Sequence, residues 1–103
     1  MDLSQDEWME KYKKVKNHII LDVRTSEEFN EARIPKSILL DFSSPIDFVK
    51  GLEPMDKEKV YLVYCRSGNR SSSACAVMTS MGFNKTFNLV GGILEWKGLI
   101  QKK

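Results

Sequence analysis

The chain has 103 residues, of which 42% are hydrophobic and 29% charged, and its formal net charge is +2. This size fits one domain with a modest core over residues 1–103, and the weak charge bias gives no reason to expect a nucleic-acid or membrane partner. Two cysteines and one histidine are too few for a structural zinc site, and no Cys-x-x-Cys pair indicates a thioredoxin-like redox protein. We therefore expect neither a metal nor another cofactor.

The first residues of the chain, 1–7, are mostly acidic and polar. They lack the basic and apolar segments of a signal peptide, and no apolar run further along is long enough to span a bilayer. We therefore expect a cytoplasmic protein.

The first predicted element is an amphipathic helix over residues 2–16. Ser4 and Glu7 have the spacing of a capping box at its start. One apolar stripe at helical spacing consists of Trp8, Tyr12 and Val15. We expect this stripe to pack against the body of the domain.

A strand is predicted over residues 18–23, and its continuous apolarity favours a parallel sheet buried on both faces. Ligands of such sheets gather at the carboxyl ends of the strands, so His18, at the amino end, is not expected to act as a base. Asp22 and Arg24 lie at the carboxyl end. We expect them to be structural, either bonding loop backbone or pairing with Glu28.

A short helix is expected to begin at Thr25, which has capping-box spacing with Glu28, and Phe29 is its expected core anchor. In the connector that follows, Arg33 and Lys36 add positive charge that we expect to face solvent.

A short strand is predicted over residues 37–41. The next helix is expected to begin with Ser44 as its N-cap and Pro45 in its first turn, and to end at Gly51. A polar connector over residues 53–59 then leads to the following strand.

The stretch that organises the chain is a predicted strand over residues 60–64, a loop over residues 65–70 and a helix over residues 71–81. Cys65 ends the strand and faces the start of the helix, where backbone N–H groups and the helix dipole favour an anion. Such a place lowers the pKa of a thiol, and two arginines in the loop add positive charge. The pattern predicts a thiolate nucleophile in an anion-binding loop.

The remaining elements are predicted to support this loop. Cys75 lies within the helix and is expected to be a small core residue, with a resolving cysteine as the alternative. A last strand is predicted over residues 86–90, and the Gly91–Gly92 turn should lie near the loop and lead into a final helix beginning at Ile93. The terminal residues 101–103 are expected to be frayed.

Strands that alternate with helices through short connectors predict an α/β domain. Its central sheet should be parallel, with helices on both faces.

Three motifs resemble those of a known family. Residues 64–71, Tyr-Cys-Arg-Ser-Gly-Asn-Arg-Ser, are similar to the active-site loop of the single-domain rhodanese family, the thiosulfate sulfurtransferases. Residues 20–24 with 28–29 resemble its Asp-Val-Arg and Glu-aromatic signature, and residues 88–96 its Gly-Gly-Ile-x-x-Trp segment. Residues 32–37 depart from the family pattern, which usually reads Gly-His-Ile-Pro-Gly-Ala. The resemblance implies the rhodanese-like three-layer sandwich.

The resemblance also implies the chemistry. Cys65 would take a sulfane sulfur from an anionic donor such as thiosulfate, hold it as a persulfide and give it to cyanide or a cellular thiol. A sulfur-accepting protein is the open alternative for the acceptor. The residues expected to bind the donor and the persulfide are Arg66, Ser67, Gly68, Asn69 and Arg70. For the two arginines, the alternative is that one of them, Arg70 above all, pairs with a carboxylate and braces the loop.

Other readings of the same cysteine remain open at this point. Related cysteine-dependent phosphatases and arsenate reductases have five residues between Cys and Arg, whereas four separate Cys65 from Arg70 here. A Cys-His hydrolase would need a histidine base, and His18 is at the wrong end of its strand. A rhodanese-like module that only binds partners would generally lack the nucleophile, which this chain retains.

Overall fold

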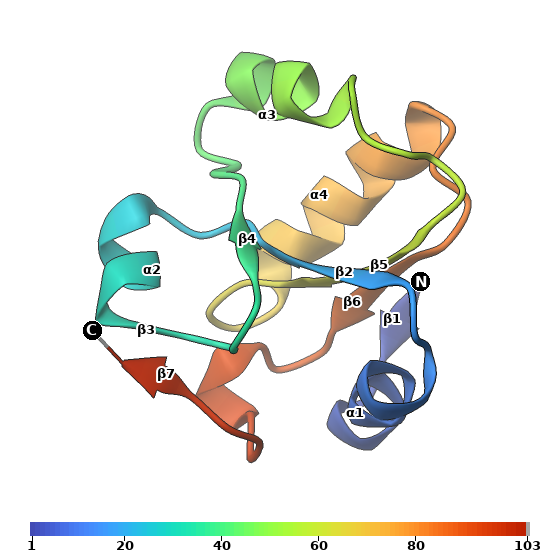
Figure 1. The fold of residues 1–103 in the computed structure, drawn as a ribbon. Helices are drawn as coiled ribbons and strands as arrows, with labels where there is room; N and C mark the ends of the chain where they lie inside the picture. The colour runs from blue at the N-terminus through green and yellow to red at the C-terminus, as the bar shows by residue number, and fades with distance from the viewer. Residues whose placement is uncertain (103) are drawn as a thin grey trace.

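A five-stranded sheet forms the centre of the computed structural model, which describes residues 1–102 (Figure 1). Every pair of neighbouring strands in it is parallel. In spatial order the strands are β1 (Asp2–Leu3), β6 (Thr86–Leu89), β5 (Val60–Tyr64), β2 (His18–Asp22) and β4 (Ile38–Leu39). The parallel sheet predicted from the continuous apolar strands is confirmed, although β4 is shorter than predicted.

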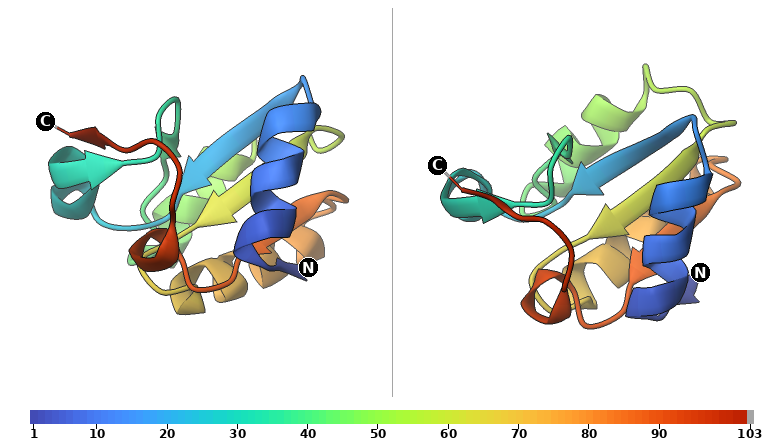
Figure 2. Two further views of the ribbon diagram at one scale, coloured as in Figure 1. Left: turned by 90° about the horizontal axis from the view of Figure 1, so that it is seen from below. Right: turned by 60° about the horizontal axis from the view of Figure 1, so that its bottom comes forward.

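Helices cover both faces of this sheet (Figures 1 and 2). Helix α1 (Gln5–Lys14) lies on one face, and α3 (Pro45–Leu52) and α4 (Asn69–Ser80) lie on the other. Strands β2 and β5 point toward the side of the molecule that carries α2 (Ser26–Glu31), as Figure 2 shows. The predicted α/β architecture with helices on both faces is therefore confirmed.

Each face has its own apolar core. The core under α3 and α4 is built around Leu21, Phe48, Tyr61, Val63, Met78 and Phe83. The core under α1 is built around Trp8, Ile20, Ile34, Leu62, Leu89 and Trp96. In this second core the ring of Trp8 meets the ring of Trp96 edge-on, with centroids 5.2 Å apart. Within residues 1–102, no helix is both long and apolar enough to cross a membrane.

The N-terminal segment differs from the prediction of one helix over residues 2–16. Asp2–Leu3 instead form β1, which pairs with β6, and the helix begins only after Ser4. The predicted capping box is confirmed, because the Ser4 hydroxyl accepts from the Glu7 N–H while the Glu7 carboxylate accepts from the Ser4 N–H. The apolar stripe did not show that the two residues before the cap extend the sheet.

Two predictions about α2 and α3 were wrong. Gly51 lies inside α3, which continues to Leu52, and the missing side chain at 51 leaves room for Leu40. Phe29 is only half-buried, and the guanidinium of Arg33 lies over its ring, 4.2 Å from the ring centroid. Phe29 therefore does not anchor α2 in either core.

The C-terminal segment also differs. The expected final helix is a single 3₁₀ turn, Ile93–Glu95. The segment expected to fray contains β7 (Gln101–Lys102), which pairs antiparallel with β3 (Ala32–Arg33). Residue 103 lies outside the described residues.

Candidate active site

Cys65 follows β5 directly and is almost completely buried, with 1% of its surface exposed. The loop after it is shorter than predicted, because α4 begins at Asn69 and Gly68 is its N-cap. Gly68 has φ +104°, and a Cβ there would lie 3.2 Å from the backbone nitrogen of Gly91. Glycine therefore lets the chain turn at once into the helix, and Asn69 and Arg70 belong to its first turn.

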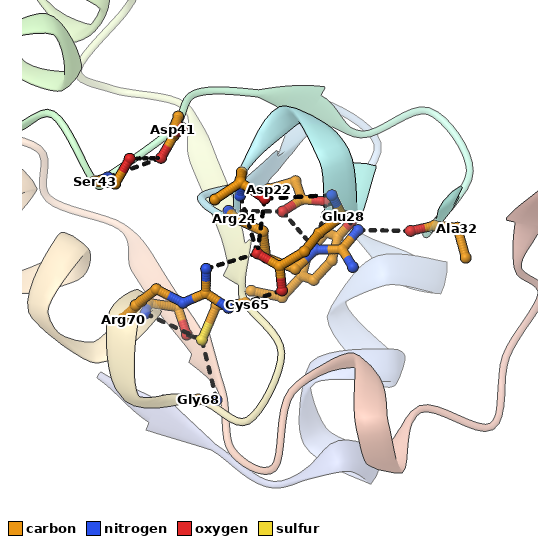
Figure 3. A network of polar contacts seen from close by, with 12 residues as sticks. Asp22, Arg24, Glu28, Ala32, Asp41, Ser43, Cys65, Gly68 and Arg70 are labelled. Atoms are coloured by element: carbon orange, nitrogen blue, oxygen red, sulfur yellow. Dashed lines mark hydrogen bonds and ion pairs between the residues drawn. The ribbon is translucent and has the colours of Figure 1, made fainter. Parts of the chain in front are cut away.

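Three hydrogen-bond donors converge on the sulfur of Cys65. The Gly68 N–H lies 3.1 Å from Sγ, the Ser71 N–H 3.4 Å and the Ser71 hydroxyl 3.3 Å. Figure 3 shows the sulfur turned into the loop toward Gly68. Oriented N–H groups of this kind form a site for an anion.

These donors act on the pKa of the thiol. Burial raises the pKa of Cys65, but the Ser71 hydroxyl and the amides of Ser71, Gly68 and Ser67 outweigh it, and the net pKa is lowered. This direction agrees with the low thiol pKa expected from the strand–loop–helix pattern. The lowering comes from the helix start and the Ser71 hydroxyl, and the charge of Arg70, which interacts electrostatically with Cys65, acts in the same direction.

Ser71 was not among the predicted site residues. The sequence offered one signal, a hydroxyl in the small-residue start of the helix after the loop.

The two loop arginines have different surroundings. Arg66 is exposed and makes no side-chain hydrogen bond or ion pair with any of residues 1–102. Arg70 bonds Glu28 through two nitrogens, at 2.8 Å and 3.0 Å, as seen in Figure 3. This pair, with bonds from Thr25, lowers the pKa of Glu28 to about 2 although partial burial opposes it. These contacts match the alternative expectation, in which Arg70 pairs with a carboxylate and braces the loop.

Of the two contacts expected for Asp22 and Arg24, the bonds to loop backbone are present and the pairing with Glu28 is not: Asp22 accepts from the backbone N–H of Arg24 at 2.9 Å. They pair with each other, Arg24 Nη2 lying 2.6 Å from Asp22 Oδ2, and both are buried. The hydroxyl of Tyr64 donates to the same carboxylate at 2.7 Å, and Arg24 also donates to the carbonyl of Ala32. The network, drawn in Figure 3, holds the carboxyl ends of β2 and β5 together beside Cys65.

The Gly91–Gly92 turn lies against the loop, as predicted. The N–H of Ile93 donates to the carbonyl of Cys65 at 3.0 Å, and the N–H of Leu94 donates to that of Arg66 at 3.1 Å. A side chain on Gly92, which has φ +62°, would collide with the Arg66 carbonyl. The segment after this turn thus holds the start of the loop through its carbonyl groups.

The other candidate residues lie apart from the sulfur or face solvent. His18 pairs with Val60 at the opposite end of the sheet, and its ring nitrogen lies 2.6 Å from the carbonyl of Val15. Ser67 and Asn69 are exposed. Cys75 is buried in the core, and burial raises the pKa of its thiol to about 11. Within residues 1–102, no three His, Cys, Asp or Glu side chains are grouped to hold a metal.

Sequence comparison identifies similar proteins. The sequence pattern of the rhodanese-like domain matches residues 4–99. YtwF of Bacillus subtilis is 37% identical over 84 residues, covering 82% of this chain and 78% of YtwF. The thiosulfate sulfurtransferase GlpE of Pseudomonas syringae is 34% identical over 79 residues, covering 77% of this chain and 72% of GlpE. A sulfurtransferase of Allochromatium vinosum is 33% identical, covering 76% and 70%.

Solved structures agree with the sequence comparison. A rhodanese-like domain protein from Staphylococcus aureus superposes with a TM-score of 0.82 at 28% identity, covering 99% of this chain and 97% of the other. A rhodanese-related protein from Thermoplasma volcanium gives a TM-score of 0.81 at 26% identity, covering 99% and 98%. The three-layer sandwich implied by the sequence motifs is confirmed.

Proposed function

The chain belongs to the rhodanese-like domain family, and from this premise we propose that it is a sulfurtransferase that carries a sulfane sulfur on Cys65. The observation that supports this most directly is the set of donors around Sγ, from Gly68 and Ser71. They stabilise a negative sulfur at the end of β5, which is what a thiol needs to act as a nucleophile.

In the first step, the Cys65 thiolate attacks the outer sulfur of thiosulfate. A bond forms between Sγ and this sulfur, the sulfur–sulfur bond of thiosulfate breaks, and its electron pair leaves with sulfite. Cys65 then carries a persulfide whose negative charge is on the outer sulfur. No proton, oxidant or reductant is needed.

In the second step, a nucleophile such as cyanide attacks the outer sulfur. The carbon–sulfur bond forms, the Sγ–sulfur bond breaks, and its electron pair returns to Sγ as a thiolate. Thiocyanate leaves. A cellular thiol, free or on a partner protein, would replace cyanide as the acceptor in vivo. Both cysteines are free thiols, which suits action in the reducing cytoplasm.

Arg66 is the residue of the loop that we assign to recognition of the donor. Its guanidinium is exposed and has no carboxylate partner within residues 1–102, so its fork of donors is available for the sulfonate oxygens. The backbone of Ser67, Gly68 and Asn69 would surround the added sulfur. Arg70 contributes positive charge nearby while it remains bound to Glu28.

Intact-protein mass spectrometry tests the proposal. The protein is incubated with thiosulfate and then divided, with cyanide added to one half. We expect one added sulfur atom per chain before cyanide and its loss afterwards. The same measurement is made on Cys65→Ser. The proposal would be refuted if folded wild-type protein gained no sulfur, or if Cys65→Ser gained as much sulfur as the wild type.

A further inference from the structure

Ser71 has one hydroxyl proton and two acceptors within reach. The side chain is completely buried on the first turn of α4. Its Oγ lies 3.3 Å from Cys65 Sγ and makes a short hydrogen bond to Oδ1 of Asn88. A hydroxyl can donate only one hydrogen bond at a time, so the two acceptors compete for it.

The orientation of Asn88 makes this competition unavoidable. Asn88 is buried on β6, and its Nδ2 donates to Asp2 Oδ1 at 2.9 Å and to the carbonyl of Gly68 at 3.3 Å. The carbonyl can only accept, and so can the carboxylate when it is ionised, so the amide nitrogen must face them. The amide oxygen therefore faces Ser71.

We propose that Ser71 is a catalytic residue whose hydroxyl donates to Asn88 while Cys65 carries the persulfide and to Cys65 Sγ when the thiolate is released. The inference rests on the proposed sulfur transfer. In the persulfide the charge lies on the outer sulfur, and Sγ is a poor acceptor. When the Sγ–sulfur bond breaks, the charge appears on Sγ, and rotation of the hydroxyl supplies a hydrogen bond without any proton transfer.

The Ser71 hydrogen bond should affect the rates of the two half-reactions differently. A hydrogen bond that stabilises the thiolate makes Cys65 a better leaving group in the second step. The same bond makes the thiolate slightly less nucleophilic in the first step. Ser71 is therefore expected to accelerate delivery of the sulfur and to do little for its uptake.

Other charged and titratable groups surround the thiol, but none of them is a donor to Sγ. They are Arg70 and Cys75 on α4, which interact electrostatically with Cys65, and Asp22 on β2 and Glu28 on α2, which interact with Arg70; Arg66 on the loop is exposed. Because Glu28 pairs with Arg70 and Asp22 pairs with Arg24, removal of the Ser71 hydroxyl leaves these charges in place.

The experiment compares Ser71→Ala with the wild type in a Cys75→Ser background, so that only Cys65 titrates as a thiol. Ser73→Ala is the matched control, because Ser73 is an exposed serine on the same helix. Thiolate absorbance gives the pKa of Cys65 in the free protein. Rapid mixing gives the rate of sulfur uptake from thiosulfate and, separately, the rate of discharge of the isolated persulfide by cyanide. Rates are compared at a pH where Cys65 is ionised in all variants.

For Ser71→Ala we expect the pKa of Cys65 to rise by about one unit and discharge to slow about three- to tenfold. Uptake should be unchanged or up to about threefold faster. Ser71→Thr, which keeps the hydroxyl, should restore discharge if circular dichroism shows it folded; if it is not folded, Ala and the control decide.

Equal slowing of both half-reactions in folded Ser71→Ala, or a pKa and discharge rate equal to the wild type, would overturn the role of Ser71. A wild-type protein that takes up no sulfur would instead overturn the proposed function and the discharge role with it. In that case the pKa comparison would still show whether Ser71 donates to the thiolate.

Discussion

Arg70 and Glu28 form an ion pair with two hydrogen bonds, Nη1 to Oε1 at 2.8 Å and Nη2 to Oε2 at 3.0 Å. The pair connects the first turn of α4, which carries the donors to Cys65, with α2. A guanidinium bound in this way has fewer N–H groups for a substrate than a free one. We therefore expect Arg66, rather than Arg70, to bind the donor.

Glu28→Gln should make the free energy of unfolding less dependent on pH in the acidic range. The pKa of Glu28 is lowered to about 2 from its usual 4.5, mainly by the hydrogen bond from Arg70, so the pair stabilises the fold above about pH 4.5 and is lost as the pH falls toward 2. Because 36% of the Arg70 side chain is exposed, solvent weakens the pair to about 0.5–1 kcal/mol near neutral pH. Urea denaturation at pH 7 and pH 3 measures the difference.

The control for this prediction is Glu27→Gln, an exposed carboxylate on the same helix. It should leave the pH dependence close to that of the wild type. An identical loss of stability between pH 7 and pH 3 in the wild type and in Glu28→Gln would contradict the role given to the pair.

Arg66→Ala should raise the KM for thiosulfate about tenfold, since a charge-assisted bond to the donor would be lost. The effect on kcat should be smaller, because Arg66 does not contact the Cys65 sulfur. Arg70→Ala should change KM less and should lower the free energy of unfolding by removing the pair with Glu28. Steady-state kinetics with cyanide as acceptor gives both constants, and Lys13→Ala, an exposed cation on α1, is the control. A larger KM effect from Arg70 than from Arg66 would reverse the assignment.

Cys65→Ser should abolish formation of thiocyanate from thiosulfate and cyanide, whereas Cys75→Ser should keep most of it. Cys65 is held by three donors, while the thiol of Cys75, with a pKa of about 11, stays protonated in the core. Colorimetric detection of thiocyanate measures the activity of both variants. Loss of activity in a folded Cys75→Ser variant would show that one nucleophile is not enough.

Hydrolysis of an aryl phosphate by this protein should be negligible. Gly68, three residues after Cys65, is the N-cap of α4, and the N–H groups of Gly68 and Ser71 converge on one sulfur atom. A phosphoryl group has three oxygens for such a loop to surround, and a loop this short encloses too little space. Insertion of a glycine after Gly68 should lower sulfur transfer. Phosphate release that depends on Cys65, with no sulfur taken up from thiosulfate, would favour a phosphatase instead.

The parts of the site that are formed by residues near one another in the sequence could be predicted from the sequence. The apolar run before Cys65 and the glycine after it specify a strand, a turn and a helix, because these are local preferences of the backbone. The capping boxes at Ser4 and Thr25 are confirmed for the same reason. The length of the loop was overestimated, since only the left-handed backbone of Gly68 shows that the helix begins at Asn69.

The parts that depend on pairing between distant segments could not be predicted. Asn88 reaches Ser71 only because β1, β6 and β5 are adjacent in the sheet, and the strand at Asp2–Leu3 is too short to leave a pattern. The partner of Glu28 depends on where α4 places Arg70, and Arg24 was nearer in the sequence. Strand β7 is likewise defined only by its partner β3.

Trp8 and Trp96, which meet edge-on, lie in the same core, and this determines which part of the protein intrinsic fluorescence reports on. The chain contains two tryptophans, and both belong to the core under α1. The core under α3 and α4 contains none, so loosening of that layer alone would leave the emission spectrum nearly unchanged. An unfolding curve recorded by fluorescence therefore follows one side of the sheet, and variants on α4 need far-ultraviolet circular dichroism beside it. Coincidence of the two curves would show that both layers melt together.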